Sequence, residues 1–134
     1  MNLRHFVIAV ILGAGAMIHE SRASQLDDWK WKNRVLIVVG PAEDSAVRQQ
    51  RQIYQSAANG MSERQIVLAE ALDDTARSRE IRSRVSADGK RFHAFLIGKD
   101  GHVALSSDKP LSADYLFQRI DAMPMRQDEM RRAR

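Results

Sequence analysis

Four short apolar runs follow residue 34, separated by longer polar stretches. The first, Val35–Val39, is a continuous aliphatic run that ends at Gly40 and Pro41. Such a run is typical of a strand that is buried on both faces of a sheet. The other three runs also predict strands, and they are Ile66–Ala69, Phe92–Ile97 and His102–Ser106.

The polar stretches between these runs carry apolar residues at helical spacing. Residues 43–61 place them at intervals of seven, four and three, which fits one face of a single helix. Residues 73–85 predict a second helix. Ser112 predicts the N-cap of a third helix that ends at Pro124, and a short charged tail follows to Arg134. The apolar face of this third helix carries Leu116, Phe117, Ile120 and Met123.

Asp100 and Gly101 separate the last two apolar runs, and Asp-Gly between strand-like runs predicts a β-hairpin. Within this hairpin, simple alternation directs Val103 and Leu105 toward the core. The complete order is β-α-β-α-β-β-α, with two βαβ crossovers followed by an antiparallel hairpin and a closing helix. This order predicts a three-layer α/β domain with a thioredoxin-like arrangement.

The N-terminal segment has the pattern of a secretory signal peptide. A short basic start precedes the apolar residues 6–18, and small residues follow up to Ala23. The apolar run is shorter than the roughly 20 residues that a membrane-spanning helix needs. We therefore expect cleavage after Ala23, with an uncleaved membrane anchor as the alternative. Removal of residues 1–23 would leave one domain, residues 24–134, in the periplasm or outside the cell, with membrane contact only during export.

The chain has 134 residues, no cysteine and a formal net charge of +4. Positive and negative residues are interspersed, which permits weak attraction to anionic envelope components without establishing it. A chain without cysteine cannot form the thiolate that disulfide exchange and peroxide reduction require. Thiol–disulfide and peroxidase activities are therefore excluded.

Three stretches resemble signature segments of one family, and they are Trp31–Leu36, Leu96–Gly101 and Ile120–Met130. Through them the chain resembles the P-DUDES group (DUF4174), a domain of unknown function in exported bacterial proteins. Related domains occur in animal secreted and extracellular-matrix proteins. The resemblance implies a thioredoxin- or peroxiredoxin-like fold without the redox cysteines. It implies no reaction, and so neither catalytic residues nor a cofactor.

In thiol oxidoreductases of this fold, a Cys-x-x-Cys motif begins the helix after the first long strand, and here that turn is Pro41–Ser45. Glu43 and Asp44 would be stabilised there as anions by the helix dipole, which does not suit a general acid at neutral pH. We interpret them as capping acids. The alternative is a ligand or cation contact at the carboxyl ends of the strands, with Arg91 as the nearest further polar candidate.

Arg126 and Glu129 lie three positions apart just after Pro124, which predicts a pair on the surface of a helix. If the C-terminal segment packs back on the domain, Arg126 would instead anchor it. Either role is structural.

The sequence favours neither a metal nor a nucleic-acid partner. Across the predicted hairpin, His93 and His102 lie roughly 20 Å apart, too far to share a metal ion. Residues 29–32 alternate tryptophan with lysine, a pattern that single-stranded nucleic-acid sites also use. The favoured interpretation is an edge segment whose tryptophans cover the core while its lysines face water.

Export and the loss of thiol chemistry favour, by elimination, a non-enzymatic module that binds a protein or another envelope component. An enzyme that uses non-thiol groups in the former redox crevice is the second hypothesis, and a deep polar pocket beside Pro41–Ser45 would support it. A membrane-tethered protein that keeps its N-terminus is the third.

Overall fold

A mixed four-stranded sheet in the order β2-β1-β3-β4 forms the middle layer of the computed structural model, which describes residues 25–134. The expected signal peptide, residues 1–23, lies outside the described residues. The central strand pairs parallel with β2 and antiparallel with β3, and β4 pairs antiparallel with β3. The strands are β1 (Arg34–Val39), β2 (Ile66–Ala71), β3 (His93–Ile97) and β4 (Val103–Ser107).

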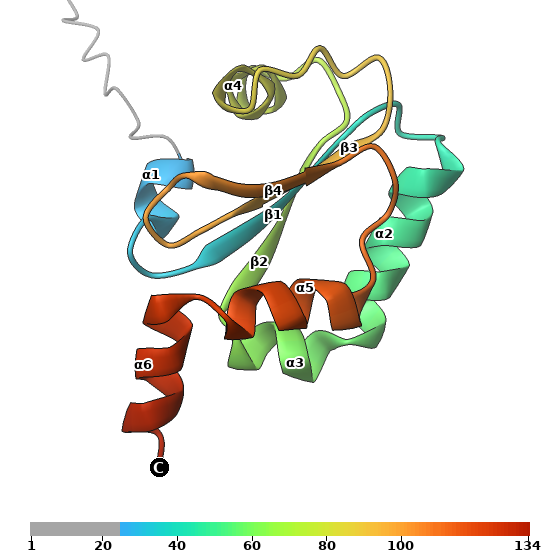
Figure 1. The fold of residues 1–134 in the computed structure, drawn as a ribbon. Helices are drawn as coiled ribbons and strands as arrows, with labels where there is room; N and C mark the ends of the chain where they lie inside the picture. The colour runs from blue at the N-terminus through green and yellow to red at the C-terminus, as the bar shows by residue number, and fades with distance from the viewer. Residues whose placement is uncertain (1–24) are drawn as a thin grey trace, which may run out of the picture.

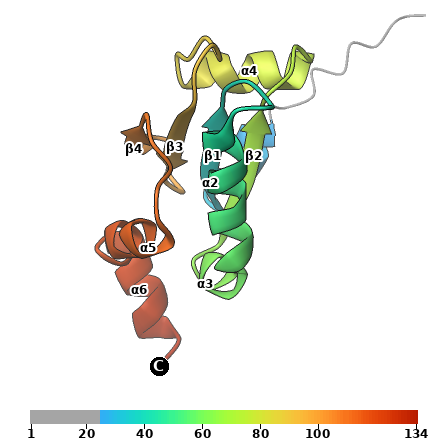
Figure 2. The ribbon, with the colours of Figure 1, turned by 90° about the vertical axis from the view of Figure 1, so that its right-hand side faces the viewer.

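Helices cover both faces of this sheet (Figure 1). On one face lie α1 (Gln25–Trp29) and α4 (Ala76–Arg84), and on the other lie α2 (Ser45–Ser56), α3 (Ala58–Glu63) and α5 (Ala113–Asp121). The view in Figure 2 separates α4 from α2 and α3, with α5 and the last helix, α6 (Pro124–Arg132), below the hairpin. None of the helices in the described part of the chain is long and apolar enough to cross a membrane.

Both faces of β1 are buried, so each face builds its own core. Leu36 and Val38 pack among the side chains of α2, α3 and α5. Val35, Ile37 and Val39 pack on the opposite side, against α4 and α1. The predicted three-layer α/β domain is therefore confirmed.

The connection from β2 to β3 differs from the prediction of two βαβ crossovers. Because β3 runs antiparallel to β1, while β2 runs parallel to it, only the β1-to-β2 connection joins parallel strands. The hairpin itself is confirmed, since β3 and β4 pair across a turn in which the Gly101 N–H donates to the carbonyl of Gly98.

The single helix predicted over residues 43–61 is wrong, because the chain leaves helical geometry at Ala57. The break separates α2 from α3 and seats Gly60 under the ring of Phe117 on α5. A Cβ atom at Gly60 would lie 2.6 Å from that ring, closer than side chains pack. The helix is thus interrupted where α3 packs closely against α5, although the apolar spacing in the sequence continues through the break.

The expectation that Val103 and Leu105 both face the core is wrong for Val103, which is 49% exposed. The register shifts between Leu96 and Ile97, so Leu105 pairs with Leu96 while Val103 pairs with Ile97. Because Leu96 and Ile97 lie on opposite faces of β3, their partners Leu105 and Val103 also point to opposite faces of the sheet. A β-bulge reverses side-chain direction in this way, and nothing in the alternation of the sequence marks it.

The two terminal segments also differ from expectation. The tryptophan–lysine segment, expected as an edge segment whose tryptophans cover the core, is the end of helix α1 and a turn. Trp29 does pack against the core, whereas Trp31 is 63% exposed. The residues after Pro124, expected as a charged tail, are indeed charged but form α6.

Candidate functional site

The candidate residues from the sequence lie at two opposite ends of β1. Glu43, Asp44 and Arg91 follow or neighbour its C-terminal end, where Gly40 approaches the backbone of Arg91 and Phe92. Arg126 lies near its first residue, Arg34, because both contact Glu129. The structure therefore does not bring the predicted candidates together.

The turn after β1 is built as a helix cap. Asp44 is the N-cap of α2, and its carboxylate accepts a hydrogen bond from the Ala46 N–H at 2.8 Å. Glu43 is exposed, and its backbone carbonyl accepts a hydrogen bond from Arg48. The capping interpretation holds for Asp44, which uses its side chain to begin a helix.

Arg91 lines a polar hollow together with Asp88 and His93. The hollow lies between β3 and the loop after α4, and its lining does not include the Pro41–Ser45 turn. The His93 ring stacks on Phe95, with ring centroids 5.8 Å apart. Within residues 25–134, no group of three or more histidine and carboxylate side chains is arranged to hold a metal ion.

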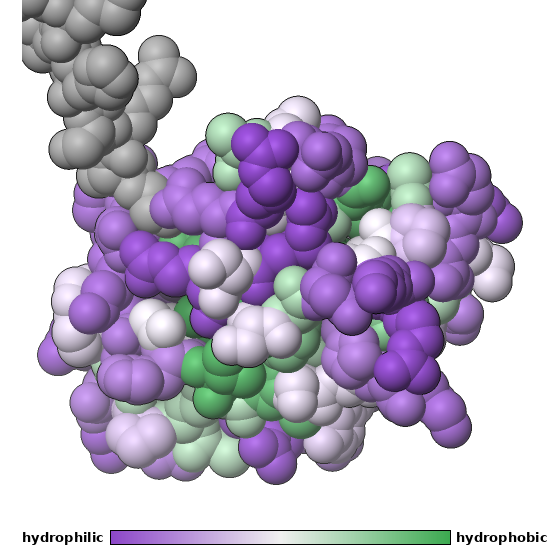
Figure 3. Space-filling view, turned by 90° about the horizontal axis from the view of Figure 1, so that it is seen from above, coloured by the Kyte–Doolittle hydropathy of each residue, from purple (hydrophilic) through white to green (hydrophobic). Residues whose placement is uncertain are grey.

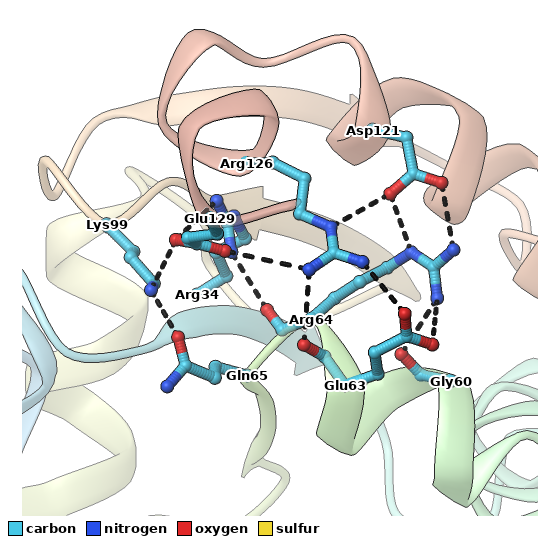
Figure 4. Close-up of polar contacts among 9 residues, drawn as sticks. All are labelled: Arg34, Gly60, Glu63, Arg64, Gln65, Lys99, Asp121, Arg126 and Glu129. Carbon is cyan, nitrogen blue, oxygen red and sulfur yellow. Dashed lines mark hydrogen bonds and ion pairs between the residues drawn. The ribbon is translucent and has the colours of Figure 1, made fainter. Parts of the chain in front are cut away.

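The most extensive polar cluster lies at the other end of β1, around Arg34 (Figure 4). The Arg34 side chain is 1% exposed, and its terminal nitrogens donate to both oxygens of Glu129, at 3.2 and 3.3 Å. It also donates to the backbone carbonyl of Arg64 at 2.9 Å. Lys99, also buried, donates to Glu129 at 2.6 Å and to the side chain of Gln65. One carboxylate from α6 thus pairs with two buried cations, one from the central strand and one from the hairpin turn.

The cluster continues through Arg126, whose side chain is 6% exposed. Arg126 donates to Asp121 at 3.1 Å and to the Glu63 carboxylate at 3.1 Å. Asp121 also accepts two hydrogen bonds from Arg64, at 2.8 and 2.9 Å. The guanidinium of Arg64 in turn lies 4.0 Å from the centre of the Phe117 ring. Of the two roles weighed for Arg126, the structure therefore favours the anchor.

The charges in this cluster shift the pKa of two carboxyl groups. Hydrogen bonds from Arg64 and then Arg126 hold the pKa of Asp121 below its ordinary value, against the opposing effect of burial. Burial alone would raise the pKa of Glu129, but hydrogen bonds from Lys99 and Arg34 outweigh it, so that pKa is also lowered. Both groups are therefore carboxylates at neutral pH, which suits ion pairing and not proton transfer.

A hollow of about 330 Å³ lies beside the Arg34 cluster. Arg34 and Lys99 form part of its lining, and the remainder comes from the β3–β4 hairpin and from the start of α6 with the residue before it. Its apolar side chains are Ala104, Met123, Pro124 and Met125. The hollow thus combines buried positive charge with adaptable apolar walls.

The backbone of Trp31 contacts that of Lys99, a lining residue of this hollow, because the Trp31 N–H donates to the Lys99 carbonyl at 2.6 Å. Its φ of 68° falls in the left-handed region, where a bulky side chain costs about 1–2 kcal/mol. The indole is nonetheless 63% exposed, with the ammonium of Lys30 5.6 Å from the ring centre. The protein therefore holds a large apolar side chain toward solvent in a strained conformation.

Sequence reasoning did not select Arg34, Lys99 or Glu129 as site residues. Each lies within one of the three stretches that carry the family resemblance, and the fold brings those stretches together in this cluster. The signal that could have identified these residues is that the three stretches lie close together in the fold, and single positions in the sequence do not show this.

Comparisons with known proteins agree on the fold. A family model described as "Domain of unknown function (DUF4174)" matches residues 25–129. The crystal structure of reduced 2-Cys peroxiredoxin from Plasmodium vivax superposes with a TM-score of 0.52 at 16% identity, covering 78% of this chain and 84% of that one. No curated protein matches the sequence. The structural similarity extends to the fold alone, and the chain has no cysteine.

Proposed function

The chain belongs to the DUF4174 family, and we propose that it is an exported, non-redox module that binds a protein or another envelope component through a thioredoxin-like scaffold. The chain contains no sulfur nucleophile, so the scaffold has no means of thiol chemistry. The signal pattern of residues 1–23 supports a periplasmic or secreted location, with membrane contact only during export.

One observation carries the binding role, namely the exposed indole of Trp31 in a left-handed backbone conformation. Strain of this kind persists where the surrounding structure enforces it, and it concentrates at ligand and partner sites. Tryptophan is also enriched among the residues that dominate binding energy in protein interfaces. A strained and exposed tryptophan beside a hollow therefore marks a contact surface.

Site-specific photo-crosslinking in the living cell tests this proposal. A benzophenone amino acid replaces Trp31 in one variant and Tyr115, a 43% exposed aromatic residue on α5, in the matched control. We expect a discrete crosslinked partner from position 31 that is absent from position 115. No adduct at position 31, or the same adducts at both positions, would refute the proposed contact surface.

The location is tested separately by N-terminal sequencing of the protein recovered from the cell envelope or the medium. We expect the processed chain to begin at Ser24. An intact N-terminus in the membrane fraction would instead support the membrane-tethered alternative.

A further inference from the structure

The hollow beside Arg34 offers both a positive charge and an apolar wall, and we infer that it receives the free C-terminal carboxylate of a partner protein whose last residue is aliphatic. This inference rests on the proposed binding function and names the chemical group that the partner inserts.

The two buried cations that line the hollow, Arg34 and Lys99, depend on a single shared carboxylate, that of Glu129. The cluster joins four cationic side chains to three carboxylates, so each cation has an ion-pair partner, but Arg34 and Lys99 share theirs. The cations are Arg34, Arg64, Lys99 and Arg126, and the carboxylates are Glu63, Asp121 and Glu129. A ligand with a single negative charge would give Arg34 and Lys99 a second carboxylate.

Arg34 and Lys99 also retain unused hydrogen-bond donors. The Nε–H of Arg34 is buried and has no hydrogen-bond partner among the described residues. Leaving a buried donor unpaired is unfavourable, more so on a charged group. The Lys99 ammonium carries three hydrogens, and Gln65 and Glu129 accept two of them. Both side chains contribute to the wall of the hollow, so these desolvated donors lie at or just behind that wall.

The apolar part of the lining restricts the class of anion. Met123, Pro124 and Met125 suit an alkyl group, and flexible methionine side chains adapt to its shape. Inorganic phosphate would leave this wall unused, and an aspartate or glutamate side chain ends in its carboxylate with no alkyl group beyond it. A C-terminal aliphatic residue carries a carboxylate and an alkyl side chain on the same carbon. A free aliphatic acid shares this combination of groups, and the experiment below distinguishes the two sources.

Asp100 also lines the hollow and opposes an entering carboxylate. Its Oδ1 accepts a hydrogen bond from the His102 N–H at 3.0 Å, which stabilises the hairpin turn. Its Oδ2 lies 3.5 Å from the His102 imidazole. Asparagine preserves the acceptor and suits a turn before glycine, so Asp100→Asn removes the negative charge while the turn is retained.

The inference is tested with the purified full chain carrying ¹³C-methyl methionine, titrated with acetyl-Gly-Gly-Leu as the free acid and as the C-terminal amide. We expect the free acid to shift the methyl signals of Met123 and Met125 and to leave that of buried Met61 unchanged. The amide should bind at least about tenfold more weakly, because it lacks the charge-assisted hydrogen bonds. Equal affinity for acid and amide, or shifts that do not include Met123 and Met125, would overturn the inference.

Two variants test the charged and the apolar parts of the hollow separately, and a small aliphatic acid tests whether a peptide is needed. Asp100→Asn should tighten binding of the free acid about threefold without changing that of the amide, because it removes a like charge at the rim. Met125→Ser, at a 38% exposed position, should weaken binding of the free acid several-fold while the protein stays folded. Hexanoate that binds as tightly as the tripeptide would overturn the partner C-terminus in favour of a free aliphatic acid.

The outcomes also separate this inference from the proposed function. Crosslinking at Trp31 together with no difference between acid and amide would refute the carboxylate site alone. Binding of the free acid without any crosslink at Trp31 would refute the protein-contact surface alone.

Discussion

Glu129 accepts one hydrogen bond from each terminal nitrogen of Arg34, which lies 95 positions earlier in the chain. The pair joins α6 to the first residue of the central strand, and Lys99 adds a contact from the hairpin turn. Because the Arg34 side chain is 1% exposed, its charge depends on this carboxylate rather than on water. The C-terminal helix is therefore held largely by ionic contacts.

Replacing Glu129 with alanine should lower the free energy of unfolding by about 3 kcal/mol, because two buried cations lose their shared carboxylate. Urea denaturation at neutral pH measures the change. The neighbouring Asp128→Ala removes a carboxylate whose surface pair with Arg131 is about half exposed, and should change stability by less than about 0.5 kcal/mol. Equal losses in the two variants would contradict the role assigned to the buried cluster.

Stability should fall in acid, since the folded protein lowers the pKa of Asp121 and Glu129. A carboxyl group with a lowered folded-state pKa contributes stability above its unfolded pKa of about 4, and this contribution disappears as pH falls through the folded value. Asp73 contributes in the same direction, because hydrogen bonds from Ser78 and then Thr75 lower its pKa to about 2. We expect unfolding free energy to be level between about pH 5 and 7 and to decline below about pH 4.

Asp121→Asn isolates one component of this acid response. The variant should be less stable than the wild type at pH 7, and its stability should decline less steeply below about pH 4. Urea denaturation of both proteins at a series of pH values gives the two slopes. Parallel slopes would show that Asp121 does not contribute.

Gln50 should be among the most sensitive core positions despite its polar side chain. Its amide donates to the Leu111 carbonyl at 3.0 Å and accepts from the Leu111 N–H at 2.7 Å, with the side chain fully buried. Gln50→Leu keeps the volume but leaves both backbone groups of Leu111 unpaired, so we expect a loss of about 2–4 kcal/mol in the free energy of unfolding. The exposed neighbour Gln49 provides the control, and a Gln49→Leu loss of the same size would contradict the interpretation.

The two tryptophans should respond in opposite ways to glycine. Trp31→Gly relieves a left-handed conformation that costs about 1–2 kcal/mol, and the greater freedom of glycine in the unfolded chain offsets part of this gain. Unfolding free energy should therefore stay unchanged or rise by about 1 kcal/mol. Trp29→Gly removes a side chain that packs on the core and should lower the free energy of unfolding by about 2 kcal/mol or more.

Thermal or urea unfolding of the two variants measures this contrast. A strong loss of stability in Trp31→Gly would mean that the indole has a structural role. In a pull-down, the wild-type chain should retain the partner identified by crosslinking at position 31 and the folded Trp31→Gly chain should not, which separates binding from stability.

Much of the fold follows from local sequence patterns. The run Val35–Val39 predicts the buried central strand, because only a strand covered on both faces is apolar throughout. Ser112 predicts the start of the third predicted helix, and its hydroxyl does accept a hydrogen bond from the Tyr115 N–H, as an N-cap residue should. These features depend on residues that are close in sequence.

The features that the sequence did not predict depend on distant contacts. The break at Ala57 serves the contact between Gly60 and Phe117, and the reversal of Val103 arises from a bulge against Leu96 and Ile97. Figure 3 looks onto the α4 side of the molecule, the face of the sheet to which this bulge turns Val103, and shows an apolar area among hydrophilic side chains. Sequence patterns reveal local periodicity, and neither the helix break at Ala57 nor the β-bulge at Val103 alters that periodicity.

The candidate site shows the same limit more strongly. Asp44 was correctly interpreted as a cap because capping is local, and Arg126 was recognised as an anchor only on the condition that the last segment packs back. Arg34 could not be recognised as buried, since arginine at the start of a strand is ordinarily solvated. Its burial depends on a carboxylate that the fold supplies from the other end of the chain.

The distance in sequence between Arg34 and Glu129 also bears on the order in which this protein can mature. While a ribosome is still producing the chain, the central strand begins with a guanidinium that has no carboxylate to enclose it. Desolvation of that group is unfavourable until α6 has emerged, so the domain closes only after α6 has been synthesised. A nascent chain of this kind remains open for longest at the edge where its first strand and last helix meet.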